Sequence, residues 1–90
     1  MSEVVDNPDA GRFELTEDGE TAVADYMRDG DTITFTHTIV PPALEGQGVG
    51  SRLVKAALDD ARAKGLRVVP QCSFVAAYID RHPEYRDLVA

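Results

Sequence analysis

Residues 41–58, PPALEGQGVGSRLVKAAL, constrain the fold of this chain more than any other segment. Two prolines end the strand that precedes them, because proline cannot donate a hydrogen bond to a sheet. Glycines follow at positions 46, 48 and 50, and glycine tolerates both a positive φ and the close approach of a ligand. An amphipathic helix comes next, and its first turn has unpaired N–H groups. A strand, a glycine loop and a helix N-terminus in series favour a site for phosphate or pyrophosphate.

Three segments before the prolines show the alternation of apolar and polar residues that is typical of half-buried strands. The predicted strands are residues 11–16, 21–28 and 32–40. Turn sequences that contain glycine separate them, which indicates an antiparallel meander. The third strand is rich in β-branched and aromatic residues. The residues that alternation places on one of its faces are Ile33, Phe35, His37 and Ile39.

A helix and a parallel strand are predicted after the glycine loop. Residues 49–64 place an apolar stripe along one side of a helix, and Gly65 has the place of a C′ residue that ends it. Residues 66–70, LRVVP, have the composition of a short strand. Because a long helix separates this strand from the one before it, we expect a crossover between parallel neighbours.

The chain is predicted to close with a second helix. This helix covers residues 74–81, with Ser73 as a candidate N-cap and Pro83 near the residue at which it stops. The order β-β-β-α-β-α then gives one compact mixed α/β (α+β) domain over residues 11–90. Residues 1–10 are acidic and polar, and we expect them to form a loose, flexible lead-in.

The overall charge and the single cysteine narrow the class of protein. The net charge is −7 and the isoelectric point about 4.6, which argues against a basic nucleic-acid-binding face but not against backbone amides that bind phosphate. One cysteine allows no intrachain disulfide, and the N-terminus lacks the pattern of a signal peptide. No apolar run reaches the ~20 residues that span a membrane. We therefore expect a cytoplasmic protein that contacts neither nucleic acid nor membrane.

Two common phosphate-binding motifs do not match the glycine loop. A P-loop needs a lysine directly after its last glycine, where this chain has Ser51 and Arg52. The dinucleotide fingerprint G-x-G-x-x-G fails because Leu53 stands where its last glycine belongs. A tight turn that packs the helix closely against a strand is the alternative to a ligand site.

The pattern that does match is [Q/R]-x-x-G-x-[G/A] after a splayed strand, here EGQGVG over residues 45–50. This loop resembles the acetyl-coenzyme-A pyrophosphate loop of the GNAT superfamily of N-acetyltransferases, in a minimal single-domain branch. Two further segments carry the resemblance: HTIVP before the loop (residues 37–41) and VPQCSFVAAYIDRHPEY after it (residues 69–85). The likeness extends in the right order from residue 12 to residue 88.

The resemblance implies how acetyl-CoA lies on this chain, and it implies no metal. The strand that ends at Val40 and the strand near Pro70 splay apart, and the pantetheine arm extends the sheet edge between them. The pyrophosphate rests on the loop and the helix N-terminus. The residues that the resemblance assigns to the coenzyme are Val40, Gly46, Gln47, Gly48, Val49, Gly50, Ser51, Tyr78 and Arg81. Glu45 departs from the usual Gln or Arg, and a carboxylate beside a pyrophosphate is unfavourable unless it points to solvent.

Cys72 is the first candidate for the chemistry itself. It follows a predicted parallel strand and lies beside a helix N-terminus, where ligands of open α/β sheets bind and where the pKa of a thiol is lowered. The thiolate could take the acetyl group, or the thiol could lie beside the thioester without reacting. A small, buried hydrophobic residue is the alternative to both roles.

Three further residues are candidates for catalysis or coenzyme binding, and each could have a structural role instead: His37, Tyr78 and Arg81. His37 could accept the proton of an amine substrate as a general base, or be a partly buried, hydrogen-bonded histidine. Tyr78 matches a family tyrosine that lies near the coenzyme thiol, although His82 and Pro83 replace the Gly-Phe that usually follows. It could instead be a core residue. Arg81 could reach the coenzyme phosphates or lie on a solvated helix end.

The function that these residues predict is that of a small acetyl-CoA-dependent N-acetyltransferase. It would move the acetyl group to an amine, on a small molecule or a protein lysine, by direct attack or through Cys72. The acidic composition mildly favours a cationic acceptor, and so short a chain leaves room for a partner protein in acceptor binding. A coenzyme-A-binding module without catalysis is one alternative. An interaction domain that keeps only the fold is the other.

Overall fold

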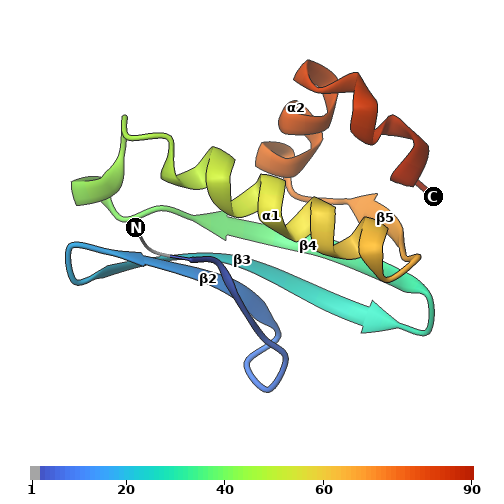
Figure 1. Cartoon of the computed structure of the whole chain (residues 1–90), viewed down its shortest axis with the longest axis horizontal. Helices are drawn as coiled ribbons and strands as arrows, with labels where there is room; N and C mark the ends of the chain where they lie inside the picture. The colour runs from blue at the N-terminus through green and yellow to red at the C-terminus, as the bar shows by residue number, and fades with distance from the viewer. Residues whose placement is uncertain (1–2) are drawn as a thin grey trace.

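The computed structural model describes residues 3–90 as a five-stranded sheet with two α-helices on one side (Figure 1). The strands are β1 (Val5–Asn7), β2 (Arg12–Glu17), β3 (Glu20–Asp29), β4 (Thr32–Ile39) and β5 (Arg67–Pro70). The helices are α1 (Val49–Ala63) and α2 (Ser73–Arg81), with short 3-10 helices η1 (Pro42–Leu44) and η2 (Pro83–Leu88). Every predicted element is present in the predicted order.

The sheet has the order β1-β2-β3-β4-β5, so each strand pairs with its neighbour in the chain. Strands β1 to β4 pair antiparallel, whereas β4 and β5 pair in parallel. Helix α1 forms the crossover between these last two strands, as a parallel pair requires. The predicted meander, the crossover and the mixed α/β fold class are therefore confirmed.

The segment predicted to be a loose lead-in contains strand β1. Val5 pairs with Glu14 of β2, and the hydroxyl of Tyr26 in β3 donates a hydrogen bond to Oδ1 of Asp6 at 2.6 Å. The prediction missed this strand because three residues are too few to show a period. Residues 1–2 lie outside the described residues. The division of the chain into a lead-in and a domain stays a prediction.

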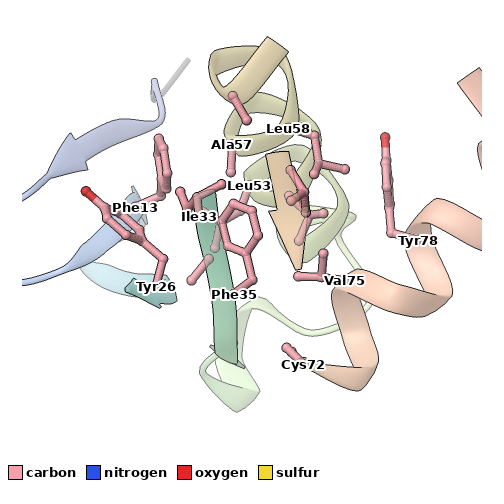
Figure 2. Close-up of a cluster of buried hydrophobic side chains, with 14 of the residues drawn as sticks. Phe13, Tyr26, Ile33, Phe35, Leu53, Ala57, Leu58, Cys72, Val75 and Tyr78 are labelled. Atoms are coloured by element: carbon pink, nitrogen blue, oxygen red, sulfur yellow. The ribbon is translucent and has the colours of Figure 1, made fainter. Parts of the chain in front are cut away.

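One hydrophobic core fills the space between the helices and the sheet face that they cover, as Figure 2 shows. The apolar stripe predicted for α1 is buried in it, with Leu53 and Leu58 fully covered. On the sheet, the rings of Phe13, Tyr26 and Phe35 have centroids 5.3 to 6.4 Å apart, the range of favourable aromatic pairs. This core holds α1 and α2 against the strands that border the site.

A β-bulge in the pair of β3 and β4 interrupts the alternation of β4. In β3, Asp25 and Tyr26 follow each other directly. Their partners in β4 are His37 and Phe35, which leaves Thr36 as an extra residue. Because side chains alternate with a period of two, one extra residue turns all later side chains to the opposite face.

The bulge corrects the faces predicted for this strand. Phe35 lies in the core as expected, but His37 and Ile39 lie on the opposite face, which no described helix covers. Thr38 takes the helix side in their place, as the partner of buried Ala24. The prediction assumed unbroken alternation, and the register between two strands is not visible in the sequence of one of them.

The predicted start of α1 at residue 49 is right, whereas its predicted end and the predicted start of α2 are each one residue too late. Gly65 follows α1 with a φ of 70°, as expected for a C′ residue. Helix α2 includes Ser73, and its N-cap is Cys72. Serine is the commoner cap, but the N–H of Cys72 donates to the carbonyl of Phe35 at 2.9 Å, which keeps Cys72 in extended backbone. The helix therefore starts one residue after Cys72.

Candidate active site

The candidate site lies where β4 and β5 separate. Residues 32–35 of β4 pair with β5, and the Cys72 N–H continues this contact at Phe35. Beyond Phe35, β4 continues to Ile39 paired with β3 alone, and the two prolines then end it. The sheet thus opens into a wedge on the β5 side of β4, as the predicted splay requires.

A cleft of about 500 Å³ occupies this wedge. The end of β4 forms one wall, the glycine loop and the first turn of α1 form a second, and α2 contributes a third. The lining residues are Thr38, Ile39, Val40, Leu44, Glu45, Gly46, Gly48, Val49, Gly50, Ser51 and Phe74. A cleft of this size, part apolar and part backbone, suits a small-molecule ligand.

The start of α1 offers free backbone donors to the cleft. Gly46 and Gly48 have φ values of 80° and 73°, a left-handed conformation that disfavours residues with a Cβ. Gly48 is the N-cap of α1, so no capping side chain of the described chain competes for the N–H groups of the first turn. Val49 and Ser51 of that turn line the cleft. These donors can bind an anionic group.

Gly50 serves close packing. A Cβ at this buried position would lie 2.6 Å from Cζ of Phe74 and 3.2 Å from Cγ2 of Val40. The missing side chain therefore lets the end of β4 and the start of α2 approach α1. Close packing of the helix against a strand, the alternative to a ligand site, therefore accounts for Gly50. The other two glycines shape the rim of the cleft.

The side chains of the loop contribute less than its backbone. Glu45 lies at the rim of the cleft and is exposed, so its carboxylate can stay in water. Gln47 is outside the lining residues, and its Nε2 donates to the carbonyl of Ala43 at 3.1 Å. Gln47 therefore ties the loop to η1 and does not face the cleft.

Cys72 adjoins the cleft without lining it. It is 8% exposed, and its Sγ lies 3.3 Å from Oγ1 of Thr38, which does line the cleft. Figure 2 shows its side chain at the start of α2, directed toward the sheet. The thiol thus lies directly behind one wall of the cleft.

The surroundings of Cys72 favour its thiolate. Burial raises the pKa of the thiol, but the Thr38 hydroxyl and the nearby N–H groups of Val75, Phe74 and Thr38 outweigh this effect, so the pKa lies below its ordinary value. Neither α2 amide makes a capping hydrogen bond of full geometry to the sulfur, so their effect is electrostatic. A lowered pKa raises the fraction of the nucleophilic form at neutral pH.

His37 does not lie with Cys72. The bulge directs it to the helix-free face of the sheet, where it is exposed and pairs with Asp25 of β3. This position is on neither the cleft wall nor the partly buried site that the plainer alternative required. A base at His37 would have to act from the open face.

Tyr78 and Arg81 lie along α2 and do not line the cleft. Tyr78 is buried, and its ring stacks on that of His82 with centroids 3.9 Å apart. Figure 2 shows its hydroxyl directed away from Cys72. Arg81 is exposed in the last turn of α2. These positions agree with a core role for Tyr78 and a solvated helix end for Arg81.

Several residues of the cleft were not predicted from the sequence. These residues are Thr38, Ile39, Leu44 and Phe74. Thr38 and Ile39 belong to the HTIVP segment, so the motif itself could have pointed to them. The bulge that turns Thr38 toward Cys72 has no signal within that segment. Phe74 stands at helical spacing from Tyr78, and this spacing is as typical of a core residue as of a cleft residue.

Neither a metal site nor a membrane span is found in the part of the chain that the structure describes. No three His, Cys, Asp or Glu side chains gather among residues 3–90 so as to hold a metal ion. No helix in the same range is long and apolar enough to cross a bilayer. The polar groups that line or adjoin the cleft are backbone amides, hydroxyls, one carboxylate and one thiol, and the rest of its lining is apolar.

Comparisons with known proteins agree with the fold. Protein NATD1 of Xenopus tropicalis is 33% identical over 52 residues, which are 58% of this chain and 48% of that protein, so the match spans about half of the relative's length. A GCN5-like protein of Staphylococcus aureus, solved by NMR in solution, superposes with a TM-score of 0.75 and 30% identity over 98% of this chain and 87% of its own. The GCN5-related N-acetyl-transferase family matches residues 12–88. The chain therefore belongs to the family of GCN5-related N-acetyl-transferases.

Proposed function

We propose that this chain transfers the acetyl group of acetyl-CoA to an amine. Membership of an N-acetyltransferase family supports the class of reaction. The observation that carries the proposal is the cleft, which joins free helix N-terminal donors, an unpaired strand edge and the contact of Thr38 with Cys72. A pyrophosphate, a pantetheine arm and a thioester need these three environments in this order.

The elements around the cleft would divide the ligand among them. The first turn of α1 would bind the pyrophosphate through its backbone N–H groups. The β5-facing edge of β4 near Val40 has no strand partner in the described residues, and it would pair with the amides of the pantetheine arm. The thioester would then lie beside Thr38 and the sulfur of Cys72.

Cys72 would act as the nucleophile in the first of two steps. Its thiolate attacks the thioester carbonyl, a new S–C bond forms, and the bond to the coenzyme sulfur breaks. The proton lost by Cys72 ends on the coenzyme thiol. The amine then attacks the acetylated cysteine, forms the amide and returns one proton to Cys72. The lowered pKa of Cys72 supports this route over direct attack of the amine on acetyl-CoA.

The acceptor would be an amine of a small molecule or of a protein lysine. The net charge of −7 favours a cationic acceptor. Ile39 both lines the cleft and lies on the helix-free face of the sheet, so that face offers the amine a way in. His37 lies on the same face and would take up the amine proton there. A partner protein or a protein substrate would complete this surface. The protein would act in the cytoplasm, because a free thiol persists in that reducing compartment.

Calorimetric titration with acetyl-CoA tests ligand binding. Ser51→Glu places a carboxylate in the first turn of α1, and we expect it to weaken binding at least about tenfold by repulsion of the pyrophosphate. Ala63→Glu adds the same charge at the exposed last residue of α1 and is the matched control. Binding that is equal in both variants would contradict the assigned anion site.

Turnover separates an enzyme from a binding module. We expect an amine panel to consume acetyl-CoA only when the protein is present, and mass spectrometry of the intact protein to detect one acetyl group on Cys72. Cys72→Ala should lose both signals if the thiol carries the group. Binding without consumption would identify a coenzyme-binding module. Absence of binding would leave an interaction domain that keeps the fold.

A further inference from the structure

Thr38 is the residue through which the cleft reaches the sulfur of Cys72. It lines the β4 wall of the cleft, and its Oγ1 lies 3.3 Å from Sγ of Cys72. Cys72 comes from the start of α2 and is almost fully buried behind that wall. A ligand in the cleft therefore meets the Thr38 hydroxyl directly beside the thiol.

The bulge at Thr36 is what brings Thr38 to this position. Unbroken alternation from Phe35 would direct His37 to the helix side and Thr38 to the open face. The extra residue reverses the two, and Thr38 becomes the partner of small, buried Ala24. The bulge thus places a hydroxyl against the thiol, besides turning His37 and Ile39 to the open face.

The Thr38 hydroxyl is the side-chain group that hydrogen bonds the sulfur within the described residues. The other groups that favour the thiolate are backbone N–H groups of Phe74, Val75 and Thr38 itself. Substitution of a side chain leaves those amides in place. The hydroxyl is therefore the one part of this environment that a single conservative replacement removes.

We infer that Thr38 is a positioning residue for acetyl transfer, whose hydroxyl holds the Cys72 side chain toward β4 and donates a hydrogen bond to its thiolate. The inference rests on the proposed function, in which Cys72 takes the acetyl group. As the thiolate attacks the acetyl carbonyl, the coenzyme S–C bond breaks and the coenzyme thiolate takes up a proton. The Thr38 hydroxyl keeps its own proton and is unchanged at the end of the step.

Three variants separate hydrogen bonding from packing. Thr38→Val removes the hydroxyl and keeps the shape of the side chain. Thr38→Ser keeps the hydroxyl and removes the methyl group. Thr34→Val makes the same chemical change on the same strand, but on the open face opposite Met27, and is the matched control.

The test is the pH dependence of alkylation by iodoacetamide, measured on the full chain without acetyl-CoA. Cys72 is the only cysteine of the sequence, so the rate reports this thiol alone. We expect Thr38→Val to react about five- to tenfold more slowly at neutral pH, because a hydrogen bond to a charged group is lost. The curve of its alkylation rate against pH should have its inflection at a higher pH than that of the wild type. At a pH high enough to ionise the thiol in both proteins, the two rates should be equal. Thr38→Ser and Thr34→Val should follow the wild type.

A Thr38→Val profile equal to that of the wild type would overturn the inference, provided that thermal unfolding shows both proteins folded. If Thr38→Val does not fold, Thr38→Ala, which also lacks the hydroxyl, takes its place, and a profile equal to that of the wild type again overturns the inference. Alkylation needs no acetyl-CoA. A failure to bind acetyl-CoA therefore counts against the proposed function and not against the contact of Thr38 with Cys72.

Discussion

Residues 32–35 of β4 lie between two strands, whereas residues 36–39 of the same strand pair with β3 alone. The two halves have similar compositions, TITF and THTI, yet they differ in their pairing with β5 and in the burial of their apolar residues. The first half buries Ile33 and Phe35 in the core. The second half exposes His37 and Ile39 and borders the cleft.

Strand pairing, and not composition, separates the half of β4 that lies in the core from the half that borders the cleft. The bulge at Thr36 divides them and exchanges the faces. Loss of β5 as a partner beyond Phe35 leaves a strand edge free for a ligand. We expect substitutions in the first half to change the free energy of unfolding, and substitutions around the second half to change binding.

The largest effect is expected for Phe35→Ala. Phe35 is fully buried and contacts the rings of Phe13 and Tyr26, so its removal leaves a cavity in the core. The free energy of unfolding should fall by about 3–5 kcal/mol, measured by urea denaturation. A loss below about 1 kcal/mol would show that this half of β4 is not the anchor of the sheet.

Gly50→Ala should act on binding more than on stability. The new Cβ would meet the Phe74 ring, which can move aside into the cleft that it lines, while alanine favours the helix by about 1 kcal/mol. We expect acetyl-CoA to bind about tenfold more weakly, or about 1.4 kcal/mol, by calorimetry. In a Phe74→Ala background, Gly50→Ala should leave the affinity for acetyl-CoA unchanged. An equal loss in both backgrounds would exclude the contact as the cause.

Tyr26 of β3 pairs with Phe35 in the first half of β4, and Tyr26→Phe tests this region through the pH dependence of the free energy of unfolding. Burial and then the hydrogen bond to Asp6 raise the pKa of Tyr26 from 10.0 to about 12. Because folding raises this pKa, its stabilisation is complete below pH 10 and is lost as the pH rises through about 12. The variant should be less stable by about 1 kcal/mol at neutral pH, and the difference should vanish between pH 10 and 12. A difference that stays constant over that range would contradict the assignment.

The smallest effect on stability is expected for Ile39→Thr, in the splayed half. Ile39 is 57% exposed on the open face, so the free energy of unfolding should change by less than about 0.5 kcal/mol. Urea denaturation beside Phe35→Ala gives the direct contrast between the two halves. A loss that approaches that of Phe35→Ala would mean that the open face is covered in solution.

The elements of the fold could be predicted because their signals are local. Periodicity defines α1, the two prolines end β4, and Gly65 ends the first helix. Strand β1, the Cys72 cap and the bulge at Thr36 could not be predicted in this way. Each of them depends on a hydrogen-bond partner that is distant in the sequence.

The candidate site shows the same division between local and distant signals. Val40 and the loop residues other than Gln47 line the cleft, because a short motif fixes the shape of a loop, and their role toward the coenzyme stays a prediction. His37 was expected on the core face, and the bulge places it on the other. Tyr78 matched a family tyrosine, but helix packing directs its ring to His82. Thr38 belongs to the HTIVP segment, but the bulge that directs its side chain to the cleft has no signal within that segment.

The most direct test of the acetyl-CoA cleft is an NMR titration that follows backbone amides as acetyl-CoA is added. We expect the amide signals of residues 38–40 and 46–51 to shift, together with those at the start of α2. The amides of residues 32–34, which are paired on both sides, should stay in place. No shift at saturating acetyl-CoA, or shifts confined to the open face of the sheet, would contradict a coenzyme site between the splayed half of β4 and α1.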